Sequence, residues 1–343
     1  MSAVRPAPAR TVGPVRGVVG VVGLLVATAL VVLALVAAHL FVGRSELSAG
    51  DVASVLVGRP RQEAYEIIVL RLRLPRVLVG LGAGALLAVS GVLVQAVVRN
   101  PLAEPATTGV GSGAAFAVVL SLLVAPGHDL VPLAALVGAV AAGAVLLLVG
   151  RRSLALTGIL VGAVFAALTS FALVVDSAPM GTVLRWLVGS LNARTTGDWQ
   201  ALWPWLALVP VAWLLASTTN AWALGAPTAV GLGVRPRLTP AVVLGVAVLA
   251  AAAAITAAGA VAFVGLVAPH VARLLVGPDH RRLVPVAAVL GAVLLSAADL
   301  VAFSVSVQLP GTGPDVSGVP VGAVTALVGA PLLVHLVRKG AAR

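Results

Sequence analysis

The sequence predicts an all-α fold, a bundle of about ten helices that crosses a lipid bilayer repeatedly. Of the 343 residues, 60% are hydrophobic and only 10% are charged, whereas about 25% of the residues in soluble domains carry a charge. The apolar residues gather in repeated runs of roughly 20, the length that a helix needs to cross the hydrocarbon core. We therefore expect one integral transmembrane domain over residues 1–343.

Hydropathy and the positions of proline, glycine and charged residues predict ten membrane segments. Their expected bounds are 18–42, 76–97, 109–125, 131–150, 154–175, 199–217, 239–264, 266–276, 284–303 and 319–337. The first apolar run is longer than the core of a signal peptide, so we interpret it as a retained span. The eighth segment is short and contains Pro269 and His270, so a re-entrant segment is the alternative there.

The distribution of Lys and Arg predicts the orientation. If residues 1–16 form a cytoplasmic tail, most of the 22 basic residues fall on the inner side, joined there by only Glu104 and Asp279 of the 11 acids. Basic residues concentrate in short cytoplasmic loops, so we expect both termini on the cytoplasmic side of the membrane. The inner cations are Arg5, Arg10, Arg16, Arg99, Arg151, Arg152, Arg235, Arg237, Arg273, Arg281, Arg282, Arg338, Lys339 and Arg343.

Tryptophans mark the two ends of the sixth segment. Trp199, Trp203 and Trp205 fall at its outer end, and Trp213 and Trp222 lie toward its inner end. Indole rings favour the headgroup level of a bilayer, so this grouping favours two aromatic belts. Packing inside the bundle is the alternative for each ring.

Several classes of function are excluded by what the sequence lacks. There is no cysteine, and the five histidines stand apart without metal-ligand spacing, so we expect no metal and no catalytic thiol. The glycine-rich stretches 80–84 and 109–113 are not followed by the Lys-Ser/Thr pair of a phosphate loop. The +11 net charge is scattered between apolar segments, which argues against nucleic acid as a partner. We expect no cofactor and no catalytic residue.

Charged residues near the outer ends of spans are candidates for binding. Arg71, Arg73 and Arg76 lie on the side that the orientation places outside. Arginine forks match carboxylates, so a partner with acidic residues is one interpretation, and snorkelling interface anchors are the other. Asp299 lies near the end of the ninth segment, where a proton relay competes with a contact to the interface or to a backbone group.

Two inner connections could couple the bundle to the cytosol. The run Asn100–Pro105 is a rigid turn between the second and third segments, because each proline disfavours helix in the residue before it. Spacing alone favours a plain connector there over a gate. The loop 217–238 is too small for a catalytic domain but suits docking to a cytosolic partner.

One internal similarity links two distant segments. The stretches 91–105 and 259–273 each run an apolar helix into a proline with a polar neighbour, and the predicted topology orients them in opposite directions. Inverted repeats with broken helices are common in transporters. Chance similarity in a chain rich in Gly, Ala and Val is an equal alternative.

Several long motifs in this order resemble the FecCD/BtuC-type permeases, the membrane subunits of ABC importers for iron-siderophores, haem and cobalamin. The resemblance covers about residues 70–338. Its most specific parts are Arg73-Leu-Pro-Arg76, Ser90-Gly-Val-Leu-Val-Gln95, Asn100-Pro-Leu-Ala-Glu-Pro105, Gly265-Leu-Val-Ala-Pro-His-Val-Ala-Arg273, Gly277-Pro-Asp-His-Arg281 and the run 319–331.

This resemblance implies a BtuC-like fold, a dimer with a second copy or a related permease, two cytosolic ATPase subunits and an external substrate-binding lipoprotein. It implies that Arg73 and Arg76 receive acidic residues of the binding protein and that Asn100 and Leu102 form the cytoplasmic gate. The residues it implies for ATPase coupling are Leu224, Gly225, Ala229, Leu232, Gly233 and Val234. We call residues 224–234 the coupling segment.

The implied cargo is an iron-siderophore, with cobalamin or haem as alternatives. A function of another class, an ion-coupled secondary transporter, would use Asp299 or His270 as its coupling group. The sequence departs from the family at two faces. Ala226, Pro227 and Val230 replace the charged residues usual in the coupling segment, Phe303 stands where an arginine is frequent, and the outer stretch 304–318 is longer and more polar.

Overall fold

The computed structural model describes residues 18–43, 47–126, 130–149, 154–177, 180–305 and 319–341. Within these ranges every regular element is helical, which confirms the predicted all-α class. The predicted tail 1–16, Arg151, Arg152 and most of the outer stretch 304–318 lie outside the described residues. The elements are α1 (Val18–Phe41), α2 (Ala49–Leu56), α3 (Glu63–Glu66), the π-helix η1 (Ile67–Arg73), α4 (Leu74–Val98), the 3-10 helix η2 (Pro105–Thr108), α5 (Val110–Val124), α6 (Val131–Val149), α7 (Leu154–Val175), α8 (Met180–Val188), α9 (Thr196–Leu202), the 3-10 helix η3 (Trp203–Ala207), α10 (Leu208–Leu214), α11 (Ala216–Ala223), α12 (Ala226–Gly231), α13 (Leu238–Ala258), α14 (Val264–Val276), α15 (His280–Ser304) and α16 (Val321–Ala341).

Each predicted membrane segment corresponds to a described helix or to a bent series of helices. Five helical stretches are long and apolar enough to cross a membrane alone: Glu63–Val98, Val131–Val149, Leu156–Val175, Leu238–Ala258 and His280–Ser304. A further crossing bends by 54° between Thr196–Leu214 and Ala216–Ala223. Shorter apolar helices occupy the remaining predicted segments. The polytopic membrane bundle is therefore confirmed, with ten as an approximate count of its segments.

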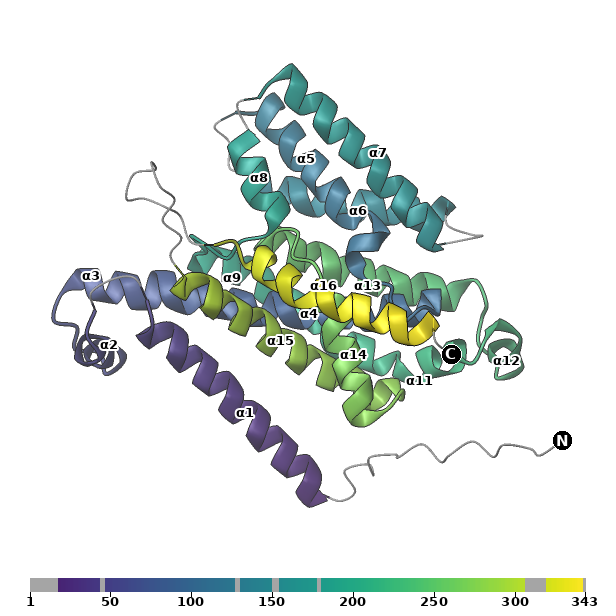
Figure 1. Ribbon diagram of the computed structural model, residues 1–343, viewed down its shortest axis with the longest axis horizontal. Coiled ribbons are helices and arrows are strands. Elements are labelled where there is room, and N and C mark those ends of the chain that lie inside the picture. The colour runs from purple at the N-terminus through teal and green to yellow at the C-terminus, as the bar shows by residue number, and fades with distance from the viewer. Residues whose placement is uncertain are drawn as a thin grey trace.

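Helix α4 is the centre of the bundle, and most of its residues are buried. It packs against α13, α14 and α15, while α5, α6 and α7 form a second group that meets this layer where α6 packs on α13. Figure 1 shows the second group above the α4 layer, with α2 and α3 at one end of the molecule and α12 at the other. Figure 1 shows the C-terminal end of α16 toward the same end of the molecule as α11 and α12.

Small residues let the central helices approach closely. A Cβ atom at Gly84 of α4 would collide with the Gly291 carbonyl of α15, and one at Gly291 would collide with Gly84 in return. Gly113 of α5 and Gly138 of α6 form a second pair of this kind. Close backbone approach strengthens helix packing in a membrane, where lipid supplies no hydrophobic force between helices. These four glycines therefore serve helix packing.

The second membrane segment begins earlier than its predicted start at residue 76. Helical backbone runs without a break from Glu63 to Val98, and its π-helical part ends at Arg73, two residues before Pro75. Proline lacks the N–H that an α-helix would use, and a wider π turn before it accommodates that loss. Pro75 therefore begins a regular α-helix while continuing an existing helical path.

The seventh segment ends at Ala258 rather than at the predicted residue 264. Gly259 takes a φ of 75°, which ends the helix, and the chain turns back into α14. Helix α14 has 13 residues and is therefore about 20 Å long, too short to cross the hydrocarbon core alone. Helix α5 is also short, with 15 residues. Helix α5 follows the 3-10 helix η2 directly through Gly109, whereas α14 follows the turn that begins at Gly259.

Candidate functional site

The two arginines predicted to bind an external partner are buried. Arg73 is 5% exposed, and its guanidinium donates to the Leu40 carbonyl of α1 at 2.6 Å. Arg76 is 8% exposed and donates from Nε and Nη2 to the two carboxylate oxygens of Asp299, at 2.7 and 2.8 Å. The third arginine of this run, Arg71, is exposed. Arg73 and Arg76 are therefore already hydrogen-bonded to groups of this chain, with which an external partner would have to compete.

Asp299 is the centre of a cluster of side chains that also contains His39, Arg76 and Phe303. His39 Nε2 lies 3.4 Å from Asp299 Oδ2, an ion-pair distance without hydrogen-bond alignment. The Arg76 guanidinium also lies 4.4 Å from the centre of the Phe303 ring. A charge in the interior of a membrane protein needs such partners. The position where the family often has arginine therefore holds a ring that covers the Arg76–Asp299 pair.

The predicted gate residues belong to one tightly bonded turn, residues 99–104, which we call the gate loop. The Asn100 side-chain oxygen accepts a hydrogen bond from the Leu102 N–H at 2.9 Å. The Asn100 carbonyl accepts from the Ala103 N–H at 3.1 Å, and Arg99 takes a left-handed φ of 55° at the end of α4. An Asx turn of this kind fixes a connection without regular secondary structure. Asn100 and Leu102 therefore lie together, as the resemblance implies.

The far end of the gate loop reaches the turn between α13 and α14. Glu104 Oε2 accepts a hydrogen bond from the Phe263 N–H at 3.0 Å. Phe263 is the N-cap of α14 and holds a left-handed φ of 69°, unusual for a residue with a side chain. Its ring packs where any side chain at Gly329 of α16 would stand. This contact was not predicted, because nothing in the sequence brings residues 104 and 263 together.

The two similar stretches, 91–105 and 259–273, pack against each other. A Cβ at Gly91 would collide with the Gly265 carbonyl, and one at Gly265 would meet the ring of Pro105. Arg273 donates to the side-chain oxygen of Gln95 at 3.0 Å. Stretch 91–105 leaves the end of α4 and reaches η2 at Pro105, whereas α14 begins inside stretch 259–273, after the left-handed N-cap residue Phe263. The two stretches therefore meet in the bundle but differ in their local structure.

The coupling segment projects a short helix between two glycine turns. Gly225 has a φ of 104° and Gly233 a φ of 82°, and both values favour glycine. Between them Ala229 is buried and anchors α12. Leu224 and Leu232 expose 65% and 62% of their surface, and Val230 exposes 50%. The six residues predicted for coupling therefore have different environments. Gly225 and Gly233 form turns, Ala229 is buried, Val234 is half-buried, and Leu224 and Leu232 are exposed.

Helix α11 joins the coupling segment to the turn between α14 and α15. The Asn220 amide nitrogen donates to Asp279 at 2.7 Å, and its oxygen accepts from the His280 backbone N–H at 2.9 Å. Asp279 caps α15 by accepting from the Arg281 N–H at 3.0 Å. The hydrogen bond from Asn220, followed by that from Arg281, lowers the pKa of Asp279 below its ordinary value. This carboxylate therefore stays ionised and bonded at neutral pH.

The other side of α11 joins the coupling segment to the gate loop. The Arg99 guanidinium lies 5.5 Å from the centre of the Trp222 ring, and it also lies beside Gly225. Trp222 is 8% exposed, and its ring N–H points to the Val97 carbonyl at 3.5 Å. The belt interpretation is therefore wrong for Trp222, which packs inside the bundle, whereas Trp203 and Trp213 are exposed.

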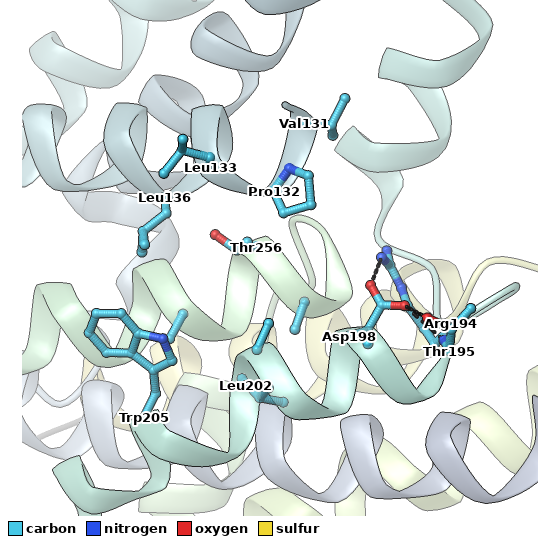
Figure 2. A pocket seen from close by; sticks show the side chains of 14 residues that line it. Val131, Pro132, Leu133, Leu136, Arg194, Thr195, Asp198, Leu202, Trp205 and Thr256 are labelled. Carbon is cyan, nitrogen blue, oxygen red and sulfur yellow. Dashed lines mark hydrogen bonds and ion pairs between the residues drawn. The ribbon is translucent and has the colours of Figure 1, made fainter. Parts of the chain in front are cut away.

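A separate cavity of about 570 Å³ lies between α6, α9 and the end of α13. Leu133, Leu136 and Trp205 supply apolar walls, and Arg194 and Asp198, paired at 3.3 Å, lie at one end (Figure 2). None of the predicted site residues lines it. Among the residues that the structure describes, no group of three His, Asp or Glu side chains lies close enough to hold a metal ion.

The chain is similar over most of its length to a known protein family and to individual permeases. The family model described as the FecCD transport family matches residues 17–339. The chain is 32% identical to the Fe(3+)-citrate import system permease protein YfmE of Bacillus subtilis, over 92% of this chain and 94% of that one. It is 36% identical to the cobalamin import system permease protein BtuC of Halobacterium salinarum, over 80% of this chain and 74% of that one.

A solved structure supports the same assignment. The chain superposes with a TM-score of 0.80 on a protein described as an inward-facing conformation of a metal-chelate type ABC transporter. The two share 27% sequence identity, and the match covers 92% of this chain and 99% of the other. The motifs, the helical bundle and the matched family model agree, so this chain belongs to the FecCD transport family.

Proposed function

We propose that this chain is the membrane permease subunit of an ATP-binding-cassette importer and works as a transport subunit without catalysing a reaction. The coupling segment carries this proposal, because Leu224, Val230 and Leu232 form an exposed apolar face on a projecting helix. An apolar face beyond the ends of the spans suits a protein partner. That partner would be a cytosolic ATPase, one subunit for each permease of a pair.

The proposed contact with the ATPase is apolar at its centre and basic at one edge. Ala226, Pro227 and Val230 bring no charge to the coupling segment, while the exposed Arg235 and Arg237 follow it directly. Apolar burial gives affinity, and charges at a rim mainly fix orientation and association rate. We expect the matching ATPase surface to be an apolar cleft with acidic residues beside it.

The proposed cargo is a ferric chelate delivered by an external binding lipoprotein, with cobalamin or haem as alternatives. YfmE, named for Fe(3+)-citrate, supports the first, and BtuC, named for cobalamin, supports the second. The cargo would pass between this chain and a second permease, either an identical copy or a relative. ATP binding and hydrolysis would favour alternate arrangements of the helices, because each ligand shifts the population toward the state it binds better.

The proposed orientation has both termini in the cytoplasm of a bacterial cell, with residues 1–343 forming one permease domain. The basic residues of the inner loops support this direction. The contacts of Arg99 with Trp222 and Gly225 place the gate loop beside the coupling segment, which fits this direction as well. In this orientation α2 and α3 face outward, toward the binding protein.

Docking of the binding protein on Arg73 and Arg76 remains part of the proposal, in a modified form. Because Asp299 already holds Arg76, an external carboxylate would have to replace an internal one. Arg71, which is exposed in the same run, offers a first contact that needs no such exchange. Docking would therefore begin at Arg71 and be completed by Arg76.

A secondary transporter coupled through Asp299 or His270 is the weaker alternative. A coupling carboxylate must be free to bind and release an ion, whereas Asp299 accepts two hydrogen bonds from Arg76. The guanidinium thus occupies both carboxylate oxygens with charge-assisted hydrogen bonds. This arrangement supports a structural role for Asp299.

The assembly of the permease with its ATPase tests the proposal. We expect Leu232→Asp and Val230→Asp each to weaken ATPase binding to the detergent-solubilised permease at least tenfold, because a charge replaces a buried apolar contact. Leu56→Asp is the matched control, since Leu56 is 50% exposed on the outward helix α2. Equal binding by all three variants would remove the coupling segment from the ATPase interface.

A further inference from the structure

We propose that the gate loop is a strut between the coupling segment and α14, and that Glu104 is the positioning residue at its inner, bundle-buried end. The proposal concerns how a movement at the cytoplasmic surface reaches the middle of the bundle. It rests on the proposed function for its biological meaning, whereas the contacts that define the strut belong to this chain alone.

One end of the strut lies against the coupling segment. Arg99 sits over the Trp222 ring at 5.5 Å and beside Gly225, the first turn residue of α12. Stacking of a guanidinium on an indole is the strongest of the cation–π contacts. Trp222 is almost fully buried, so it cannot shift without moving what it touches. A displacement of α12 would therefore press on the first residue of the gate loop.

The middle of the strut is stiff. Within six residues the gate loop has the hydrogen bond from the Leu102 N–H to the Asn100 side chain and the bond from the Ala103 N–H to the Asn100 carbonyl. Pro101 fixes its own φ, and Pro105 restricts the backbone of the residue before it. A segment with so little internal freedom transmits a push instead of absorbing it.

The other end of the strut lies against the start of α14. The Glu104 carboxylate accepts the Phe263 N–H at 3.0 Å. No side chain of the α13–α14 turn caps this helix, so a carboxylate from a distant loop meets the unpaired N–H groups and the positive end of the helix dipole. Pro105, next in the chain, packs against the Gly265 backbone and reinforces the same contact.

Beyond α14 the contact continues to α16. The Phe263 ring fills the space beside Gly329, where a side chain would collide with it. The left-handed backbone of Phe263 directs this arrangement and is costly for a residue with a Cβ atom, so surrounding contacts must hold it. Glu104 is the polar contact that holds its N–H. The structure thus connects Trp222, Arg99, Glu104 and Phe263 in one line from the cytoplasmic surface to the last helix.

A simple capping role for Glu104 is the competing explanation. A cap would stabilise α14 locally and would leave the coupling segment without influence on that helix. A strut makes the start of α14 respond to a change at Trp222, which lies at the opposite end of the gate loop. Communication between the two ends therefore separates the explanations.

Hydrogen exchange on the purified full-length permease tests the strut without any partner. We expect Glu104→Ala to speed exchange of the Phe263–Val267 amides about tenfold, as loss of one half-buried hydrogen bond to a carboxylate implies. Glu104→Gln keeps an acceptor and should change it less. Trp222→Leu should also speed exchange of these amides, and it should have no further effect in the Glu104→Ala background, because the two residues act in series.

Two outcomes would overturn the proposal. Either Trp222→Leu leaves exchange at 263–267 unchanged, or its effect persists in full when Glu104 is alanine. Glu66→Ala, which removes an exposed acid on α3, is the control and should leave these amides unaffected. A separate assay of ATP-driven uptake by the wild-type complex judges the proposed function. Its failure would refute the importer assignment, while the exchange result would still decide whether the strut exists.

Discussion

Arg76 of α4 and Asp299 of α15, which are 223 residues apart in sequence, join the two helices through two parallel hydrogen bonds inside the bundle. His39 of α1 approaches the same carboxylate at 3.4 Å. Three helices therefore meet at one charge. Because Arg76 is 8% exposed and Asp299 is 1% exposed, the pair fixes the helices relative to each other.

Removing one partner of this pair should destabilise the protein strongly. We expect Asp299→Leu to lower the free energy of unfolding by about 3–5 kcal/mol, since the Arg76 guanidinium would stay buried without its carboxylate. Thermal unfolding in detergent measures the loss. Arg61→Ala is the control, because Arg61 pairs with Asp51 at the surface with a 68% exposed side chain and should cost at most about 1 kcal/mol. Equal losses would mean that the buried pair contributes no more than a surface pair.

The same ion pair predicts how docking responds to a milder change. Asp299→Asn keeps the shape of the side chain and removes its charge, which should release Arg76 for an external carboxylate. We expect the folded fraction of this variant, in nanodiscs, to bind the external binding protein several-fold more tightly than wild type. Unchanged affinity would assign Arg76 a structural role only, and weaker docking by Arg71→Glu would then identify Arg71 as the outer contact.

The close approach of α4 and α15 predicts a sharp difference between two glycines. Gly84→Ala should cost about 1–3 kcal/mol or more of stability, because its Cβ would collide with the Gly291 carbonyl. Gly245→Ala places the same atom on a helix where no other group stands within 4 Å. It should be neutral or stabilising by about 0.5–1 kcal/mol through helix propensity. Similar thermal shifts for both variants would contradict the described crossing of α4 and α15.

The Asx turn of the gate loop predicts a specific pair of phenotypes. Asn100→Ala removes the acceptor of the Leu102 N–H, so the turn should loosen by about 1 kcal/mol and the uptake per ATP hydrolysed should fall several-fold. Asn100→Asp retains the acceptor and should behave nearly as wild type. Measuring uptake and hydrolysis on the same proteoliposomes compares the variants, and identical ratios for all three proteins would show that this turn does not act as a gate.

The link between Asn220 and Asp279 predicts a pH dependence with a definite sign. Hydrogen bonds lower the pKa of Asp279 in the folded protein. Its contribution to stability is therefore complete above the unfolded pKa of about 4 and is lost as pH falls through the lower, folded value. We expect thermal stability to lose this contribution only below about pH 4, and Asp279→Asn to abolish that part of the acid dependence. A loss between pH 5 and 7 would contradict the assignment.

The membrane segments could be predicted because hydropathy reports directly on burial in lipid. Helix α2 could also have been found, since Ser48 and Asp51 stand at capping-box spacing and form that box in the structure. The early start of the second segment could not, because the π-helix before Pro75 relieves a backbone conflict that depends on its neighbours. Lipid-facing patterns locate helices well but say little about how the chain enters them.

The sequence motifs of the candidate site are local, whereas the contacts that connect them are not. The resemblance indicated Asn100, Leu102 and the coupling segment, and the structure brings Asn100 and Leu102 together. The contacts of Glu104 with Phe263 and of Arg99 with Trp222 join residues more than 120 apart. They arise from crossings of helices whose sequence signals are local, so no pattern in one segment announces its partner in another. The left-handed backbone of Phe263 is likewise invisible in a residue type that rarely adopts it.

ATP-driven uptake is the most direct test of the central claim that this chain is an importer permease. Purified permease, ATPase and binding protein would be placed in sealed vesicles and supplied with a ferric chelate, with ATP or an ion gradient as the only energy source. We predict uptake that requires ATP and the binding protein and persists when the ion gradient is collapsed. Uptake that continues with an inactive ATPase and stops with the gradient would contradict the claim.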